Sequence, residues 1–247
     1  MSVPRPWTVL PYGPIVELGN NLRAVEGTLP SGNLPRRMLI AKRADGRLLF
    51  YNAIPLAEED MRSLEAFGTP SFLIVPNAFH RLDIHAFKQR YPGLQLLCPA
   101  AIRGQVQKTA PVNGDLTDFP GDPLVSLVPV RGTKIGEPVL VVKSTGAAAL
   151  GFGDLMMNIV QARGLDGFLF KLLGSIGGPR VTQIARLLMI ADRAAVRAHL
   201  EELAALPDLA FLVPTHGQII DRGAPDVLRE VALALGGRRP PKTPARS

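Results

Sequence analysis

Three polar segments of this chain each follow an apolar run typical of a buried strand. Pro76 to His85 (PNAFHRLDIH) follows SFLIV, Gly151 to Asp154 follows AAAL, and Pro214 to Gly217 (PTHG) follows AFLV. In α/β sheets, ligand sites gather at the carboxyl ends of strands. The side chains there that bind ions or transfer protons are imidazoles and carboxylates. The candidate catalytic and metal-ligating residues are therefore His80, Asp154 and His216.

These residue types are sufficient for one catalytic ion. A single divalent metal needs three protein ligands and one open position to activate a water. In that scheme Asp154 is a ligand or general base, His216 a ligand, and His80 a ligand or oxyanion partner. Asp83 and His85 are weaker candidates, because the pattern favours Asp83 as the cap of a helix beginning near Ile84 and His85 as a solvated first-turn residue.

The first half of the chain is expected to alternate strands and helices. Asp45-Gly46 lies between two β-rich runs and predicts a hairpin, because its turn requires residues that tolerate positive φ. The later order, strand-helix-strand-helix, favours parallel strands. The expected strands are 15–18, 22–28, 37–43, 48–51, 71–75 and 94–97, and the expected helices are 57–67, 84–91 and 100–108.

The second half is expected to hold further strands followed by helices. Asp192 is a predicted N-cap, and Pro225 suits the first turn of the last helix. His199 is expected to be a surface residue of the middle helix. The expected strands are 125–130, 139–144, 147–152 and 210–213, and the expected helices are 182–190, 193–205 and 224–235.

Together these features resemble the metallo-β-lactamase superfamily over about residues 14 to 236. The resemblance implies a four-layer αββα sandwich with its site along one edge, formed by one domain over residues 1–236. It also implies that Asp154 matches the family's metal-bridging aspartate and that His216 matches the histidine of its P-x-H-G motif. Residues 237–247 are expected to form a disordered basic tail.

The first metal-binding motif of that family, H-x-H-x-D-H, is not conserved in this chain. Its four ligand positions correspond here to Asn77, Phe79, Arg81 and Leu82. Phe and Leu side chains bind no metal, and Arg places a cation where an ion would lie. The expected cofactor is therefore one divalent metal (Zn, Fe or Mn), or none.

Composition excludes several classes of protein. The chain has 247 residues, a net charge of +7 and 47% hydrophobic residues, which favours a layered core. No apolar run is long enough for a membrane helix, and no signal peptide is apparent, so cytoplasmic location is expected. Without a run of basic residues in the body of the chain, neither nucleic acid nor membrane is an expected partner. The single cysteine, Cys98, is expected to be an inert core residue.

Three functional hypotheses follow. The first is a hydrolase-like protein with a reduced metal site, acting on an ester, thioester, amide or phosphoester of unknown identity. The second is a non-catalytic module that binds a small ligand or partner on the same fold, and the absence of the first ligand set favours it. The third is a metal-free hydrolase that uses a His–Asp pair.

Overall fold

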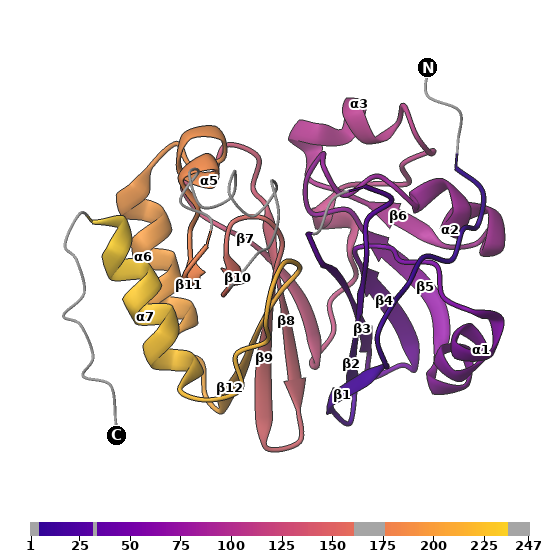
Figure 1. The fold of residues 1–247 in the computed structure, drawn as a ribbon, viewed down its shortest axis with the longest axis horizontal. Helices are drawn as coiled ribbons and strands as arrows, with labels where there is room; N and C mark the ends of the chain where they lie inside the picture. Colours follow the sequence, from indigo (N-terminus) through magenta and orange to yellow (C-terminus); the bar gives the residue numbers. More distant parts are fainter. Residues whose placement is uncertain (1–4, 32–33, 161–175, 237–247) are drawn as a thin grey trace.

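The structure, a computed structural model, describes residues 5–31, 34–160 and 176–236. Two sheets lie face to face, with helices on both outer sides (Figure 1). The predicted αββα sandwich is therefore confirmed.

The first sheet has six strands in sequential order. Its first four strands pair antiparallel, and the last two join in parallel. The Asp45-Gly46 turn is present, with Gly46 at a φ of 80°. The strands are β1 (Val16–Gly19), β2 (Leu22–Gly27), β3 (Arg36–Lys42), β4 (Arg47–Tyr51), β5 (Thr69–Ile74) and β6 (Gln95–Leu97).

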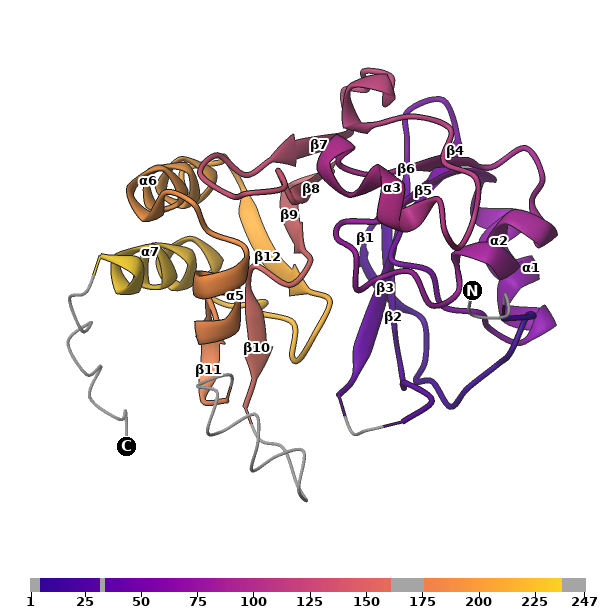
Figure 2. The ribbon, with the colours of Figure 1, turned by 90° about the horizontal axis from the view of Figure 1, so that it is seen from above.

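The second sheet has four strands in the order β12-β9-β8-β7. Only the β12–β9 pair is parallel. A separate two-stranded ribbon, β10 with β11, lies beside this sheet (Figure 2). The strands are β7 (Val125–Pro129), β8 (Pro138–Ser144), β9 (Ala147–Phe152), β10 (Met157–Ile159), β11 (Gly178–Arg180) and β12 (Leu209–Pro214).

Helices cover the outer face of each sheet (Figures 1 and 2). The helix-bearing connections of the first sheet explain its parallel strands, because a parallel crossover needs a dozen or more residues. The first sheet carries α1 (Glu58–Phe67), α2 (Ile84–Arg90), the 3₁₀ turn η1 (Ala100–Ile102) and α3 (Arg103–Val106). The second sheet carries α5 (Gln183–Leu188), α6 (Arg193–Leu203) and α7 (Ala224–Leu235), and a further turn, η2 (Leu116–Asp118), precedes β7.

The core is divided into three clusters that match these layers. One lies between the two sheets and includes Leu39 and Tyr51 of the first sheet and Leu140 and Val213 of the second. The other two lie between each sheet and its helices. Aliphatic side chains therefore pack on both faces of each sheet, as the composition predicted.

Several local predictions are corrected by the structure. Asp83 does not cap α2 through its side chain, because its carboxylate pairs with Arg36 at 2.6 Å. His199 is buried, not on the surface, and its Nδ1 accepts a hydrogen bond from the Arg131 amide at 2.9 Å. The helix expected at 100–108 is two short turns, η1 and α3.

Other predictions are confirmed or remain untested. Asp192 caps α6 by accepting from the amides of Ala194 and Ala195. Pro225 lies in the first turn of α7. The predicted tail, 237–247, lies outside the described residues, and the single-domain extent of 1–236 stays a prediction. Among the described residues, no helix is long and apolar enough to cross a membrane.

Candidate metal centre

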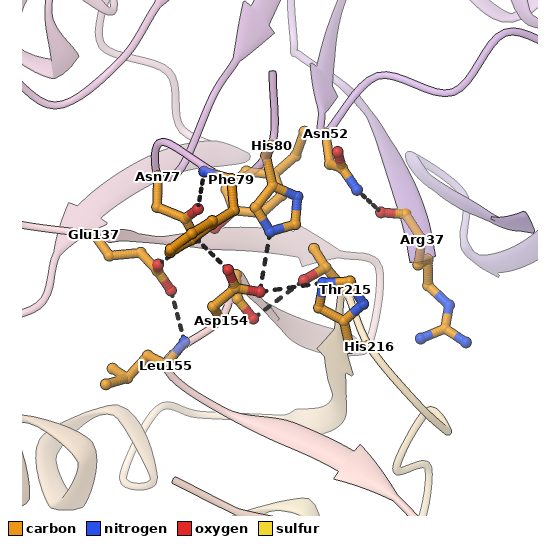
Figure 3. Close-up of polar contacts among 12 residues, drawn as sticks. Arg37, Asn52, Asn77, Phe79, His80, Glu137, Asp154, Leu155, Thr215 and His216 are labelled. Atoms are coloured by element: carbon orange, nitrogen blue, oxygen red, sulfur yellow. Dashed lines mark hydrogen bonds and ion pairs between the residues drawn. The ribbon is translucent and has the colours of Figure 1, made fainter. Parts of the chain in front are cut away.

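His80, Asp154 and His216 converge at the edge between the two halves of the sandwich. One ligand atom from each lies within 4.8 Å of the others, and all three residues are buried. Nε2 of His80 and Nε2 of His216 each lie 3.1 Å from Oδ1 of Asp154 (Figure 3). The structure therefore brings the three predicted residues together, while their metal-binding and catalytic roles stay predictions.

Strand pairing explains this convergence. Pro214 and Phe152 are opposite each other at the ends of the parallel strands β12 and β9. The residues that follow, His216 and Asp154, therefore leave the sheet at the same edge. His80 comes from the loop after β5 in the other sheet. Each half of the chain thus contributes to the cluster.

The tautomer of His216 is fixed by the backbone. Its Nδ1 lies 2.7 Å from the carbonyl oxygen of Pro35, and a carbonyl only accepts, so Nδ1 carries the proton. In the neutral imidazole, Nε2 then presents a lone pair to the Asp154 carboxylate. A contact of 3.1 Å between two lone pairs is stable only with a cation on or between them, either a proton or a metal ion.

The second oxygen of Asp154 is held by Asn77. The amide nitrogen of Asn77 lies 3.0 Å from Oδ2 of Asp154 and 2.8 Å from Oε2 of Glu137. Its carbonyl oxygen accepts from the Phe79 amide at 2.9 Å, which fixes the orientation of the amide group. Asn77 therefore turns Oδ1 of Asp154 toward both imidazoles.

Glu137 is a buried acid behind this cluster. Its Oε1 accepts from the Leu155 amide at 2.9 Å, and the carboxyl is packed so closely that a Cβ on Gly153 would lie 2.7 Å from it. Burial raises the pKa of Glu137 to about 8, and the Asp154 charge acts in the same direction. Glu137 therefore keeps its proton to a higher pH than an exposed glutamate does.

For Asp154, the two histidines outweigh the effect of burial on the pKa. Burial alone would raise the pKa of Asp154, but the charge of His80 and hydrogen bonds from both imidazoles lower it. Burial likewise opposes a charge on His216, yet the Asp154 carboxylate and the Pro35 carbonyl raise the His216 pKa. Asp154 is therefore the anionic member of the cluster.

The loop that carries His216 is fixed from both sides. The Asn158 amide of β10 donates to the His216 carbonyl at 3.0 Å. From the first sheet, Nη1 of buried Arg37 donates to the carbonyls of Pro214 at 2.6 Å and Gly217 at 2.7 Å. Gly217 has a φ of 99°, and a Cβ there would lie 2.1 Å from the Asn158 oxygen, so this position requires glycine.

The remaining sequence candidates lie outside the cluster. Asp83 forms its buried ion pair with Arg36, and His85 is a half-buried residue of α2. Neither belongs to a group of potential ligands among the described residues. Arg81 is bound to the carbonyls of Ala78 and Gln105, so it places no cation at the site.

Sequence reasoning missed Glu137, Arg37 and the Pro35 carbonyl. Glu137 precedes β8 with no motif around it, and Arg37 resembles any strand arginine. Asn77 was noted only as a lost ligand, although an amide next to a carboxylate is a known means of orienting a metal ligand.

A cavity of about 250 Å³ opens onto the cluster. The three candidate residues line one part of it. Its apolar walls are Leu29, Leu34, Phe79, Leu82 and Met157. Site and cavity together have the form of an enzyme site or a small-ligand site.

The donor set fits a single divalent ion. Two imidazoles and a carboxylate are the ligands of mononuclear zinc and iron centres. Donors at about 2.1 Å from a tetrahedral ion lie about 3.4 Å apart, and the two Nε2–Oδ1 separations are 3.1 Å. The Pro35 contact occupies Nδ1 of His216 and leaves Nε2 facing Asp154, where it could hold an ion, as in metal-ligating histidines generally.

Comparison with solved structures identifies the fold. The chain is similar to the DIM-1 metallo-β-lactamase (TM-score 0.61, 12% identity, 92% of this chain and 99% of that chain covered). It is also similar to a metallo-β-lactamase from Hirschia baltica (0.57, 16%, 94% and 99%). A third is FIM-1 from Pseudomonas aeruginosa in its mono-zinc form (0.55, 12%, 92% and 96%). This chain therefore has the metallo-β-lactamase fold.

Comparisons by sequence give no further assignment. No family model matches the chain, and no curated protein matches it. At 12–16% identity, the solved structures establish the fold alone.

Proposed function

We propose that this protein is a metal-dependent hydrolase that uses one divalent ion, Zn, Fe or Mn, at His80, Asp154 and His216. Its substrate is a small ester, thioester, amide or phosphoester. The observation that carries the proposal is that the Pro35 carbonyl keeps a proton on Nδ1 of His216, so that the 3.1 Å contact between Nε2 and Oδ1 of Asp154 requires a proton or an ion. The mono-zinc form of a structural neighbour supports a one-ion site on this fold.

A bound divalent ion supplies a water of lowered pKa and polarises the scissile carbonyl or phosphoryl group. The chain's own residues hold and orient the parts of the reaction. Nε2 of His80 and Nε2 of His216 act as neutral ligands, and Oδ1 of Asp154 acts as anionic ligand or general base. Asn77 holds Oδ2 of Asp154 by a hydrogen bond, which would leave Oδ1 for an ion, and the apolar cavity walls would contact the substrate.

Elemental analysis and hydrolysis assays test this proposal together. The purified protein is stripped with a chelator, reconstituted with Zn, Fe or Mn, and assayed on a panel of the four substrate classes. We expect about one equivalent of ion and chelator-sensitive turnover. His216→Ala should lose both, whereas His85→Ala, a histidine outside the cluster, should keep both.

Less than a tenth of an equivalent of each ion after reconstitution would refute the metal site. Hydrolysis that survives chelation but is lost in His216→Ala would instead identify a metal-free His–Asp pair.

A non-catalytic binding module is the second candidate. The observation that favours it is that Asn77, Phe79 and Leu82 stand at three of the family's ligand positions without offering a metal ligand. It predicts saturable binding of a small ligand in the cavity with no turnover under any metal condition.

A further inference from the structure

Two of the lost ligand positions now form part of the cavity wall. Phe79 and Leu82 both line the cavity that contains His80, Asp154 and His216. Phe79 is 76% exposed, the largest exposed fraction among the large hydrophobic residues described. Its amide is bound to the Asn77 side chain at 2.9 Å, so the backbone that presents the ring is fixed. An exposed ring on a fixed backbone beside a catalytic cluster has no core-packing role, which points to a ligand contact.

The rest of the apolar wall comes from other segments. Leu29 and Leu34 lie on the β2–β3 connection, and Met157 begins β10. Together with Phe79 and Leu82 they surround the site with aliphatic and aromatic surface. A substrate that reaches the cluster must therefore place an apolar group against these side chains.

The charged groups of the cavity have partners within the protein, except for one nitrogen of Arg36. Nη1 of Arg36 lies 2.6 Å from the buried carboxylate of Asp83, which Arg5 also approaches at 3.5 Å, whereas Nη2 of Arg36 is buried without a hydrogen-bond partner among the described residues. The Asp154 carboxylate faces two imidazoles at 3.1 Å. The unpartnered donor favours a substrate that brings an acceptor oxygen, which the carbonyl of an ester or thioester supplies.

We propose that the cavity binds the apolar acyl group of an ester or thioester, and that Phe79 and Leu82 select for it. This proposal rests on the proposed function and names its substrate class. Water adds to the acyl carbon, the C–O or C–S bond breaks, the leaving alcohol or thiol takes up a proton, and a carboxylic acid remains. A methylene group occupies roughly the volume of a water, about 30 Å³. Because the cavity of about 250 Å³ must also hold the reacting carbonyl and its water, an acyl chain of about eight carbons is an upper limit.

A chain-length series provides the test. Zinc-reconstituted protein is assayed on p-nitrophenyl esters from acetate to dodecanoate. Burying one methylene corresponds to about a fourfold gain in kcat/KM. We expect kcat/KM to rise by about that factor per methylene and to level off or fall beyond about eight carbons.

Substitutions in the cavity wall show which side chains produce the dependence of kcat/KM on chain length. Phe79→Ala and Leu82→Ala should flatten the rise severalfold while retaining one equivalent of zinc. Leu233→Ala removes a partly exposed leucine of α7, outside the cavity lining, and should leave the series unchanged.

A binding measurement separates this proposal from the proposed function. Alkan-1-ols of four to ten carbons are titrated into metal-free protein and followed by ligand-detected NMR. Chain-length-dependent binding that Phe79→Ala abolishes, without ester turnover, would support the cavity assignment and overturn the hydrolase. Turnover that does not depend on chain length would overturn the cavity assignment and leave the hydrolase standing. A preference for a hemisuccinate ester over the alkanoate ester of equal length would refute the apolar acyl group.

Discussion

Asn77 is the side chain whose removal tests the organisation of the site most directly. Its amide nitrogen donates to Asp154 at 3.0 Å and to Glu137 at 2.8 Å, and both acceptors are buried. Asn77→Ala leaves these oxygens without their common donor. A hydrogen bond to a charged group contributes about 1.5–3 kcal/mol, and burial prevents water from replacing it. We therefore expect a loss of about 3 kcal/mol in the free energy of unfolding.

Asn77→Asp removes the amide donor of this side chain and leaves its other contacts in place. It keeps an acceptor for the Phe79 amide but places a third carboxylate beside Asp154 and Glu137. In chelator-treated protein this variant should be less stable than Asn77→Ala at pH 7. The order of stability is therefore wild type, then Ala, then Asp.

Urea unfolding followed by circular dichroism measures these differences. Asn20→Ala is the matched control, because the exposed Asn20 side chain accepts one amide hydrogen bond, and its loss should amount to about 1 kcal/mol or less. The reasoning fails if Asn77→Ala is no more destabilising than Asn20→Ala, or if Asn77→Asp is as stable as wild type. With metal, Asn77→Ala should also weaken ion binding by about 10–100-fold, measured by calorimetric titration.

Three further predictions concern single residues. Burial raises the pKa of Cys98 to about 11, so the native thiol should not react with a disulfide reagent at pH 8 and should react only in denaturant; rapid native reaction would contradict its burial. Burial and the Arg131 charge lower the pKa of His199. The native state therefore binds fewer protons than the unfolded state, and stability should fall below about pH 6.5. His199→Asn should lose this pH dependence in urea titrations between pH 7.5 and 5, and an unchanged slope would be inconsistent with the assignment. Gly217→Ala should lower stability by about 2 kcal/mol or more because of the close Asn158 oxygen and the positive φ, whereas Gly93→Ala, with open space around it, should change it by less than about 0.5 kcal/mol.

The sequence predicted most strands and helices because their apolar runs end at clear turn residues. Ala147–Phe152 and Ala224–Leu235 match the predicted bounds fully. The strands β10 and β11 were missed, since each has three residues and Pro179 interrupts the second pattern. Such short strands exist through their pairing with each other, and pairing is not visible in local periodicity.

The site was predicted in part for a similar reason. His80, Asp154 and His216 were found because each follows a strand, and strand ends share an edge. Asp83 occupies the predicted N-cap position of α2, but the bond of its side chain to Arg36, 47 residues away, was not predicted. Glu137 was missed because its role depends on burial beside Asp154, which only the packed sheets produce.

The division of the cluster between the two sheets has a consequence for folding. His80 belongs to the first half of the chain, Asp154 and His216 to the second, and Arg37 crosses from β3 to hold the last loop. An ion bound by all three residues joins the halves as a removable cross-link. At a free concentration one hundred times its dissociation constant, such an ion stabilises the folded state by about 2.7 kcal/mol. If the proposed ion is bound, its removal should therefore lower the stability of the folded protein as well as abolish the proposed turnover.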